Sequence, residues 1–351
     1  YVLTITSLLL AILYFFVLGP QRSRASAAPV PTSSLDEAID LRRQRARRFE
    51  MVSLPPFRPH RLLPPEVTQR LGRIAFNLGL VVILLWSALP VLALIMMSLS
   101  PPADLIRVPP SLFPSAVTVD NYVSVLAAEG KTGPQAKRVP ISITNSFIVG
   151  ASVAVINVFL GTLAGYAFAR HARSRFFGMS LWGLLLTRMI PALTLVLPFF
   201  IIFRMLGLLD THLALIIAYS SILLPLCSWM MKTSFESIPI SLERAALIDG
   251  CTRTTMLLKI LMPAVRPGII AALIFAFLVS WNEFLFALIL TSTPSAQTIP
   301  VVIAGFLSQA QFYEYGPLFA ASVLAILPPV LVAFFFQRYL VQGVLSGAVK
   351  G

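Results

Sequence analysis

The sequence has few charged residues and few residues of the kinds that bind metals. Only 12% of its 351 residues are charged and 57% are hydrophobic, whereas about a quarter of an ordinary soluble domain is charged. Its two cysteines and three histidines show no ligand spacing, which argues against a disulfide framework or a zinc site. No phosphate-binding loop of the form G-x-x-x-x-G-K-[S/T] occurs. We therefore expect an integral membrane protein that binds neither a metal nor ATP itself.

Hydrophobic runs of about 20 residues, long enough to cross a bilayer as a helix, occur six times in the main body of the chain. They are Ile74–Leu99, Ile143–Phe168, Met179–Phe203, Leu213–Met231, Ile269–Leu290 and Leu318–Tyr339. We expect an all-α integral membrane protein whose six-helix transmembrane domain covers residues 74–351, after a basic, proline-containing linker over residues 20–73. The apolar segment 1–19 is either an additional transmembrane helix or a signal sequence, since Ala25-Ser26-Ala27 has the small residues of a cleavage site.

Arginine and lysine collect on one side of the predicted membrane, which sets the expected orientation. The segment Gln21–Arg73 holds eleven arginines and five acidic residues, and the loops Ala169–Arg175 and Phe235–Arg266 are also basic. We expect these loops and the C-terminal tail to be cytoplasmic in a protein of the cell membrane. A net charge of +13 could suggest nucleic-acid binding, but basic segments beside apolar spans are typical of anchors that face anionic lipid.

One polar segment, Ser237–Pro267, separates two of the predicted spans. Ser241 is predicted to cap a first helix, and Glu243 in its first turn favours the helix dipole. Ala246 and Gly250 are predicted to share a face without bulky side chains, and Gly250 is predicted to end the helix. The sequence therefore indicates a short helix whose small residues allow another surface to approach closely.

A second helix is predicted to begin at Thr252, with Pro263 and Pro267 breaking the chain before the next span. The complete segment resembles the cytoplasmic coupling loop of ABC-importer permeases, which has the pattern EAA…G…I.LP. The residues that carry this resemblance are Glu243, Arg244, Ala245, Ala246, Asp249, Gly250, Ile260 and Pro263. The resemblance implies that these residues dock an ATPase subunit.

The resemblance has one departure, at the acidic position of the motif. When the chain is aligned on Ala245-Ala246, that position holds Arg244, and Glu243 comes one residue earlier. A helix turns by about 100° per residue, so Glu243 and Arg244 are predicted to point in different directions. The chemistry of the contact with the ATPase is therefore open.

Three further segments resemble the second permease of maltose- and trehalose-type importers, in the carbohydrate-uptake family. They are Asn145–Arg170, Ser280–Ser292 and Leu345–Gly351. The resemblance implies a transport subunit with no catalytic residues, paired with a second permease, two ATP-binding cassette subunits that bind ATP and Mg, and an extracytoplasmic sugar-binding protein. ATP hydrolysis in those partners would drive alternating access for a di- or oligosaccharide.

Polar residues inside predicted spans are candidates for the substrate pathway, because they are costly in a bilayer. The main candidates are Trp281, Asn282 and Glu283, and the weaker ones are Asn145, Thr187 and Arg188. These residues could instead anchor a helix at the membrane interface or bridge helices, and the partner permease could supply most sugar contacts. An ion-coupled secondary transporter is the alternative function, and it would require ionisable groups in the middle of spans.

Overall fold

The computed structural model describes residues 65–107, 113–127, 134–171, 174–308 and 315–348, so the predicted N-terminal segment 1–19 lies outside the described residues. The described residues form helices and loops and no strand, which confirms the all-α class. The chain divides into two compact units, residues 1–92 and 93–351. Helix α3 (Pro65–Ser98) crosses this boundary and begins inside the predicted linker, before the span expected from Ile74.

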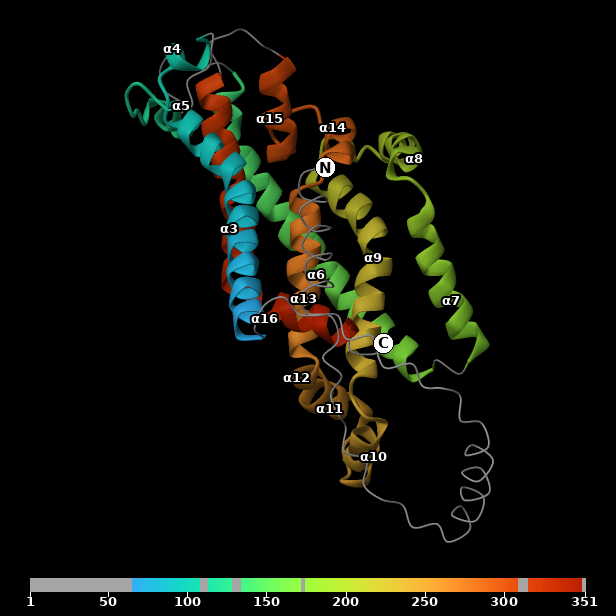
Figure 1. Cartoon of the computed structure of the whole chain (residues 1–351). Helices are drawn as coiled ribbons and strands as arrows, with labels where there is room; N and C mark the ends of the chain where they lie inside the picture. The colour runs from blue at the N-terminus through green and yellow to red at the C-terminus, as the bar shows by residue number, and fades with distance from the viewer. Residues whose placement is uncertain (1–64, 108–112, 128–133, 172–173, 309–314, 349–351) are drawn as a thin grey trace, which may run out of the picture. The chain divides into compact units, whose positions relative to one another are not determined.

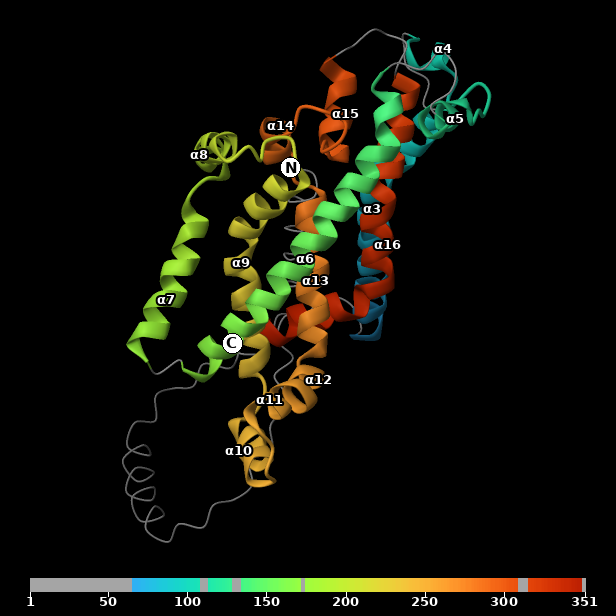
Figure 2. The same cartoon turned by 180° about the vertical axis from the view of Figure 1, so that it is seen from behind.

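Three long helices run side by side in the second unit (Figures 1 and 2): α6 (Val139–Arg170), α9 (His212–Glu236) and α13 (Arg266–Trp281). Helix α16 (Tyr315–Ala348) packs against α13. Among the described residues, four helices are long and apolar enough to cross a membrane, and the number is up to six if each of two bent helix pairs forms one span. When each bent pair is counted as one span, the number of candidate spans in the main body equals the predicted six.

Shorter helices lie near both ends of these long helices and in the bent pairs. They are α4 (Pro102–Leu105), α5 (Asp120–Leu126), η1 (Ala136–Arg138), α7 (Arg175–Leu186), η2 (Thr187–Met189), α8 (Ala192–Met205), α10 (Ile240–Ile248), α11 (Arg253–Met256), η3 (Leu257–Leu261), α12 (Met262–Ala264), α14 (Leu285–Leu290) and α15 (Ile299–Ser308). Helices α10, α11 and α12 lie together at one end of α9 and α13, and α14 and α15 lie at the opposite end (Figures 1 and 2).

The third predicted span, Met179–Phe203, is not a continuous helix. Helix α7 and the 3-10 turn η2 end before Pro191, and α8 continues at an angle of 95°. A proline restricts the residue before it to extended backbone, and Ile190 has φ −73° and ψ 122°. The predicted span therefore consists of two helices joined at an angle, because Pro191 breaks the helix.

The fifth predicted span, Ile269–Leu290, is also divided. Helix α13 ends at Trp281, and the separate helix α14 starts at Leu285. The carboxylate of Glu283 accepts hydrogen bonds from the backbone N–H groups of Phe286 (2.9 Å) and Ala287 (3.3 Å), which are the unpaired donors of a new helix start. The prediction of one continuous span was wrong because Glu283 caps a second helix.

Helices α6 and α9 approach closely through two glycines of α6, Gly161 and Gly165. A Cβ atom added to Gly165 would lie 2.6 Å from the Cβ of Met231 and 2.7 Å from the backbone nitrogen of Lys232. The Cβ of an alanine at Gly161 would lie 3.0 Å from the backbone carbonyl carbon of Cys227. This G-x-x-x-G spacing is a common means of close helix packing in membranes.

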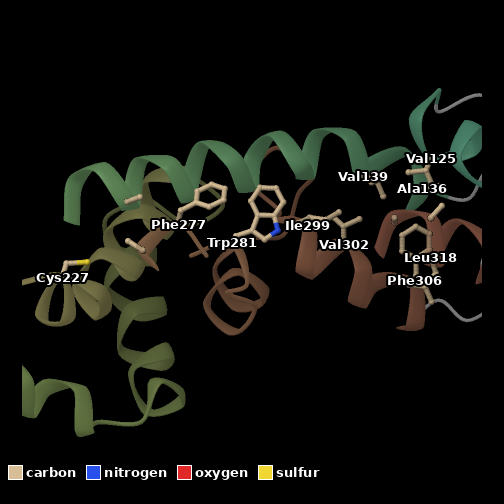
Figure 3. Close-up of a cluster of buried hydrophobic side chains, with 14 residues drawn as sticks. Val125, Ala136, Val139, Cys227, Phe277, Trp281, Ile299, Val302, Phe306 and Leu318 are labelled. Carbon is tan, nitrogen blue, oxygen red and sulfur yellow. The ribbon is translucent and has the colours of Figure 1, made fainter. Parts of the chain in front are cut away.

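A buried apolar cluster joins residues from both shorter and longer helices (Figure 3). Its labelled members are Val125, Ala136, Val139, Cys227, Phe277, Trp281, Ile299, Val302, Phe306 and Leu318. These side chains come from α5, η1, α6, α9, α13, α15 and α16. The cluster therefore fixes the end of α13 that leads into Glu283 and α14.

Candidate functional site

The polar segment Ser237–Pro267 folds as a series of short helices, as predicted, but its first cap differs from the prediction. Helix α10 starts at Ile240 directly after Pro239, with no side-chain cap. Ser241 lies inside the first turn, so the prediction that it caps the helix was wrong, because Pro239 already sets the entry of the chain. Pro239 is the N-cap residue, and its backbone is extended, with φ −59° and ψ 135°.

Gly250 ends α10, which confirms the prediction made for it. It has φ +84°, a left-handed conformation that glycine adopts without steric cost. The backbone N–H of Cys251 donates to the carbonyl of Ala246 at 3.0 Å, and that of Gly250 donates to the carbonyl of Leu247 at 3.2 Å. This pair of bonds is the Schellman motif, which satisfies the last carbonyl groups of a helix.

The second part of the segment also begins as predicted. The hydroxyl of Thr252 caps α11 by accepting from the backbone N–H of Thr255 at 3.2 Å. The next turn, η3, is π-helical and contains Ile260. Pro263 lies in the first turn of α12, and the chain bends by 72° before α13. The sequence did not indicate the π-helical turn.

Helix α10 has an inner face and an outer face. Glu243 and Ala246 are buried, whereas Arg244, Ala245 and Ile248 are exposed, and Ile248 is 85% exposed. The expected separation of Glu243 from Arg244 therefore occurs. The prediction that Ala246 and Gly250 share an accessible face was wrong, because Ala246 belongs to the core and Gly250 follows the end of the helix.

The inner face of α10 belongs to a buried cluster that also includes the ends of three long helices. Its buried members are Val158, Met231, Phe235, Ile238, Ala246, Met256, Leu261, Val265 and Ala272. They come from α6, α9, α13 and the polar segment between α9 and α13. This packing attaches the polar segment to the long helices as one body.

Glu243 forms an ion pair with Arg170, the last residue of α6. Both side chains are largely buried, with exposed fractions of 11% and 10%. Arg170 also donates to the carbonyl of Ile238 at 3.4 Å, and the hydroxyl of Tyr166 lies 3.5 Å from the second carboxylate oxygen of Glu243. The sequence indicated neither Arg170 nor Tyr166, because their contact with Glu243 joins residues far apart in the chain.

The main pathway candidates lie at the junction of α13 and α14. Trp281 is only 3% exposed and lies in the apolar cluster (Figure 3), where its indole N–H donates to the carbonyl of Ala325 at 3.1 Å. Asn282 is exposed, and its amide donates to the carbonyl of Leu278 at 2.7 Å. Glu283 uses both carboxylate oxygens to cap α14. Of these three, Asn282 is the most accessible side chain.

The weaker candidates lie elsewhere. The amide of Asn145 donates to the carbonyl groups of Pro294 and Gln297, both at 3.0 Å, and its oxygen lies 2.9 Å from Nε2 of His212. Asn145 thus bridges α6, the start of α9 and the loop after α14.

Thr187 and Arg188 occupy the break between α7 and α8. Both are exposed, the hydroxyl of Thr187 donates to the carbonyl of Leu184, and Nη1 of Arg188 donates to the carbonyl of Ile222 at 3.0 Å. Irregular backbone at membrane depth is tolerated where it is buried in protein or lines a water-filled cavity. The six candidates thus lie in three separate locations, which are the junction of α13 and α14, the surroundings of Asn145, and the break between α7 and α8.

A further polar residue, Asp210, joins the loop before α9 to the loop after α14. Its backbone has φ +60°, which aspartate tolerates better than most residues. Its carboxylate accepts from the backbone N–H groups of Ser292 (2.8 Å) and Thr293 (3.0 Å). Burial opposes ionisation, but the hydrogen bonds from Thr293 and Ser292 outweigh it, so the pKa of Asp210 is lowered from its ordinary value.

The lowered pKa of Asp210 predicts a pH-dependent contribution to stability. A carboxylate whose pKa is lower in the folded state stabilises the fold above its unfolded value, about 3.9, and this contribution is lost as pH falls through the folded pKa. We expect the thermal unfolding midpoint of the wild-type protein to fall towards that of Asp210→Asn on acidification. Equal pH profiles for the two proteins in detergent would contradict this role, since all other titrating groups are shared.

Comparison with known proteins identifies the family. A family described as binding-protein-dependent transport system inner membrane component matches residues 157–346, more than half of the chain. The chain is 37% identical over 269 residues to the trehalose transport system permease protein SugB of Mycobacterium tuberculosis, covering 76% of this chain and 93% of that protein. It is 35% identical over 263 residues to the sulfoquinovosyl glycerol transport system permease protein SmoH of Agrobacterium fabrum, covering 75% and 88% respectively.

A solved structure shares the fold. A chain of a bacterial ABC transporter involved in the import of the acidic polysaccharide alginate matches with a TM-score of 0.61 and 22% identity, over 81% of this chain and 99% of that chain. This chain therefore belongs to the family of binding-protein-dependent transport system inner membrane components. It is a multi-pass membrane permease and a transport component, which confirms the resemblance found in the sequence.

Proposed function

We propose that this chain is a sugar permease of an ATP-driven ABC importer and that residues 235–267 dock an ATPase subunit. The observation that carries this proposal is the two-sided construction of α10. Its inner face is fixed to the long helices by Glu243 and Ala246, and its outer face presents Arg244, Ala245 and Ile248 without a covering segment among the described residues. An attached helix with an accessible apolar outer face is suited to receiving force from a soluble partner.

The outer face of α10 combines apolar contact area with charge. Ile248 is its most exposed apolar side chain, and Leu242 and Leu247 are exposed beside it. Arg244 and Asp249 add one charge of each sign. Partly exposed apolar anchors surrounded by polar groups are typical of protein interfaces. Arg244, in place of the acidic residue of the family motif, would pair with an acidic group on the ATPase.

The proposed assembly contains a second permease subunit, two ATP-binding cassette subunits and an extracytoplasmic sugar-binding protein. ATP and Mg would bind to the cassette subunits, since the sequence of this chain lacks a phosphate-binding loop. The polar segment and the C-terminus would be cytoplasmic, because the loops Ala169–Arg175 and Phe235–Arg266 carry several arginine and lysine residues, which favour the cytoplasmic side. Cycles of ATP binding and hydrolysis would switch the permease pair between outward-open and inward-open states.

The substrate class follows from the relatives, whose names specify trehalose and sulfoquinovosyl glycerol transport. We propose a di- or oligosaccharide or a glycoside. Asn282 and Arg188 are the exposed polar side chains at breaks between helices, where they could hydrogen-bond to sugar hydroxyl groups. Trp281, Glu283 and Asn145 would then act by holding these breaks in place, and Thr187 would lie beside Arg188.

The alternative of an ion-coupled secondary transporter has less support. It requires an ionisable side chain that is free to bind the coupling ion. Glu283 is the acidic residue closest to this requirement, and both of its carboxylate oxygens are occupied in capping α14. Membership of a binding-protein-dependent family also favours the importer.

To test the proposal, the complex would be co-purified from its native membrane and then reconstituted into proteoliposomes. Uptake of a panel of labelled sugars, each presented with candidate binding proteins, would be measured with ATP inside or with an ion gradient alone. We expect ATP-dependent uptake of one sugar class and ATP hydrolysis that its loaded binding protein stimulates. Uptake that needs an ion gradient and no ATP would contradict the proposal and support the secondary transporter.

A further inference from the structure

The ion pair between Arg170 and Glu243 connects two helix ends of opposite electrostatic character. Arg170 is the last residue of α6, where the helix dipole favours a cation, and Glu243 is in the first turn of α10, where it favours an anion. The two residues are 73 positions apart in the chain. The pair therefore joins the polar segment to a helix that does not lead directly into it.

Arg170 contacts both sides of the junction between α9 and α10. Besides pairing with Glu243, its guanidinium donates to the carbonyl of Ile238, which lies in the link between these helices. An arginine can make several such bonds at once because its donors are arranged in a rigid, planar fork. The link, the start of α10 and the end of α6 are thus held at one point.

The burial of this pair makes its geometry sensitive to the loss of one partner. Both side chains are about nine-tenths buried, and a buried charge without its partner is costly, whereas an exposed ion pair contributes little. Lys232 and Glu236 form the other ion pair among the described residues, within α9, and they are more exposed, at 18% and 29%. This second pair offers a matched control.

We infer that Arg170 and Glu243 are a positioning pair that makes α6 move together with α10, so that displacement of the docking helix reaches the pathway. The inference rests on the proposed function, because it assigns to the pair the transmission of ATP-driven motion. Close packing of Gly161 and Gly165 against α9 continues the same rigid connection along α6. A motion that enters at α10 would therefore displace α6 and α9 together.

The experiment measures sugar transported per ATP hydrolysed in proteoliposomes containing the complete complex. We expect Arg170→Gln and Glu243→Gln each to lower this ratio by about tenfold, a size typical of coupled residues in contact. The charge exchange R170E/E243R is expected to recover part of the loss, because it restores a pair at the same place but reverses the favourable contact of each charge with its helix dipole. Lys232→Gln, which breaks the second pair outside the docking segment 235–267, is expected to keep the wild-type ratio.

The possible outcomes distinguish a failure of the positioning role from a failure of the proposed function. Wild-type ratios in the two single variants would overturn the positioning role. Recovery in the exchange variant also excludes simple misfolding as the cause of the loss. A wild-type complex that transports sugar without hydrolysing ATP would instead overturn the proposed function itself.

Discussion

Replacing Ile248 by aspartate is expected to abolish ATP-driven uptake while the permease remains folded. Ile248 is 85% exposed at the end of α10, so the folded chain loses almost no packing when this side chain becomes polar. In a complex with the ATPase, the same change would place a charge in an apolar contact, and anchors of this kind contribute about 2 kcal/mol or more to binding. The affinity for the ATPase would fall by roughly thirtyfold or more.

Three measurements check this expectation. Co-purification reports the amount of ATPase bound, uptake reports transport, and the unfolding midpoint in detergent reports the integrity of the fold. Ile248→Val is the matched control, since it keeps an apolar side chain and should retain most binding. Full transport by Ile248→Asp would show that the outer face of α10 is not the docking surface. Equal losses for both variants would show that shape alone, and not apolar contact, is required.

Among the glycine-to-alanine substitutions in α6 and α7, Gly165→Ala is expected to cause the largest loss of stability. The new Cβ would lie 2.6 Å from the Cβ of Met231 and within 2.8 Å of backbone atoms of α9, which cannot rotate away as a flexible side chain can. Overpacking of this kind costs about 1–3 kcal/mol. We expect a lowered unfolding midpoint and reduced yield of the assembled complex.

Two further glycines provide the matched series. Gly161→Ala should cost less than Gly165→Ala, because its nearest contacts are 3.0–3.1 Å. Gly183→Ala, in α7, should cost nothing, since no atom lies within 4 Å of its added Cβ. Equal midpoints for all three variants would contradict the close packing of α6 on α9.

The sequence predicted the elements whose signals are local. Gly250 ends a helix and Thr252 starts one because each determines the backbone of its own neighbourhood. The number of candidate spans also followed from hydrophobic length alone. The break before Pro191 could have been predicted from the restriction on the residue before proline, but hydrophobicity concealed it.

The rest required the tertiary structure. The role of Glu243 depends on Arg170 at the end of a distant helix, and the role of Gly165 depends on Met231 of α9. Glu283 is a candidate sugar contact on the basis of sequence, and only the structure shows that its carboxylate caps the start of α14. In each case the sequence shows the residue type, but only the tertiary structure shows which residue it contacts.

The most direct test of the account places a photo-crosslinking amino acid at Ile248 in the assembled complex. Phe113, which is 71% exposed, provides an exposure-matched control outside α10. We predict a crosslink from position 248 to the ATP-binding subunit and none to that subunit from position 113. If position 248 gave no crosslink to an ATPase that remains bound and active in the same complex, α10 would not be the docking element and the central claim would be wrong.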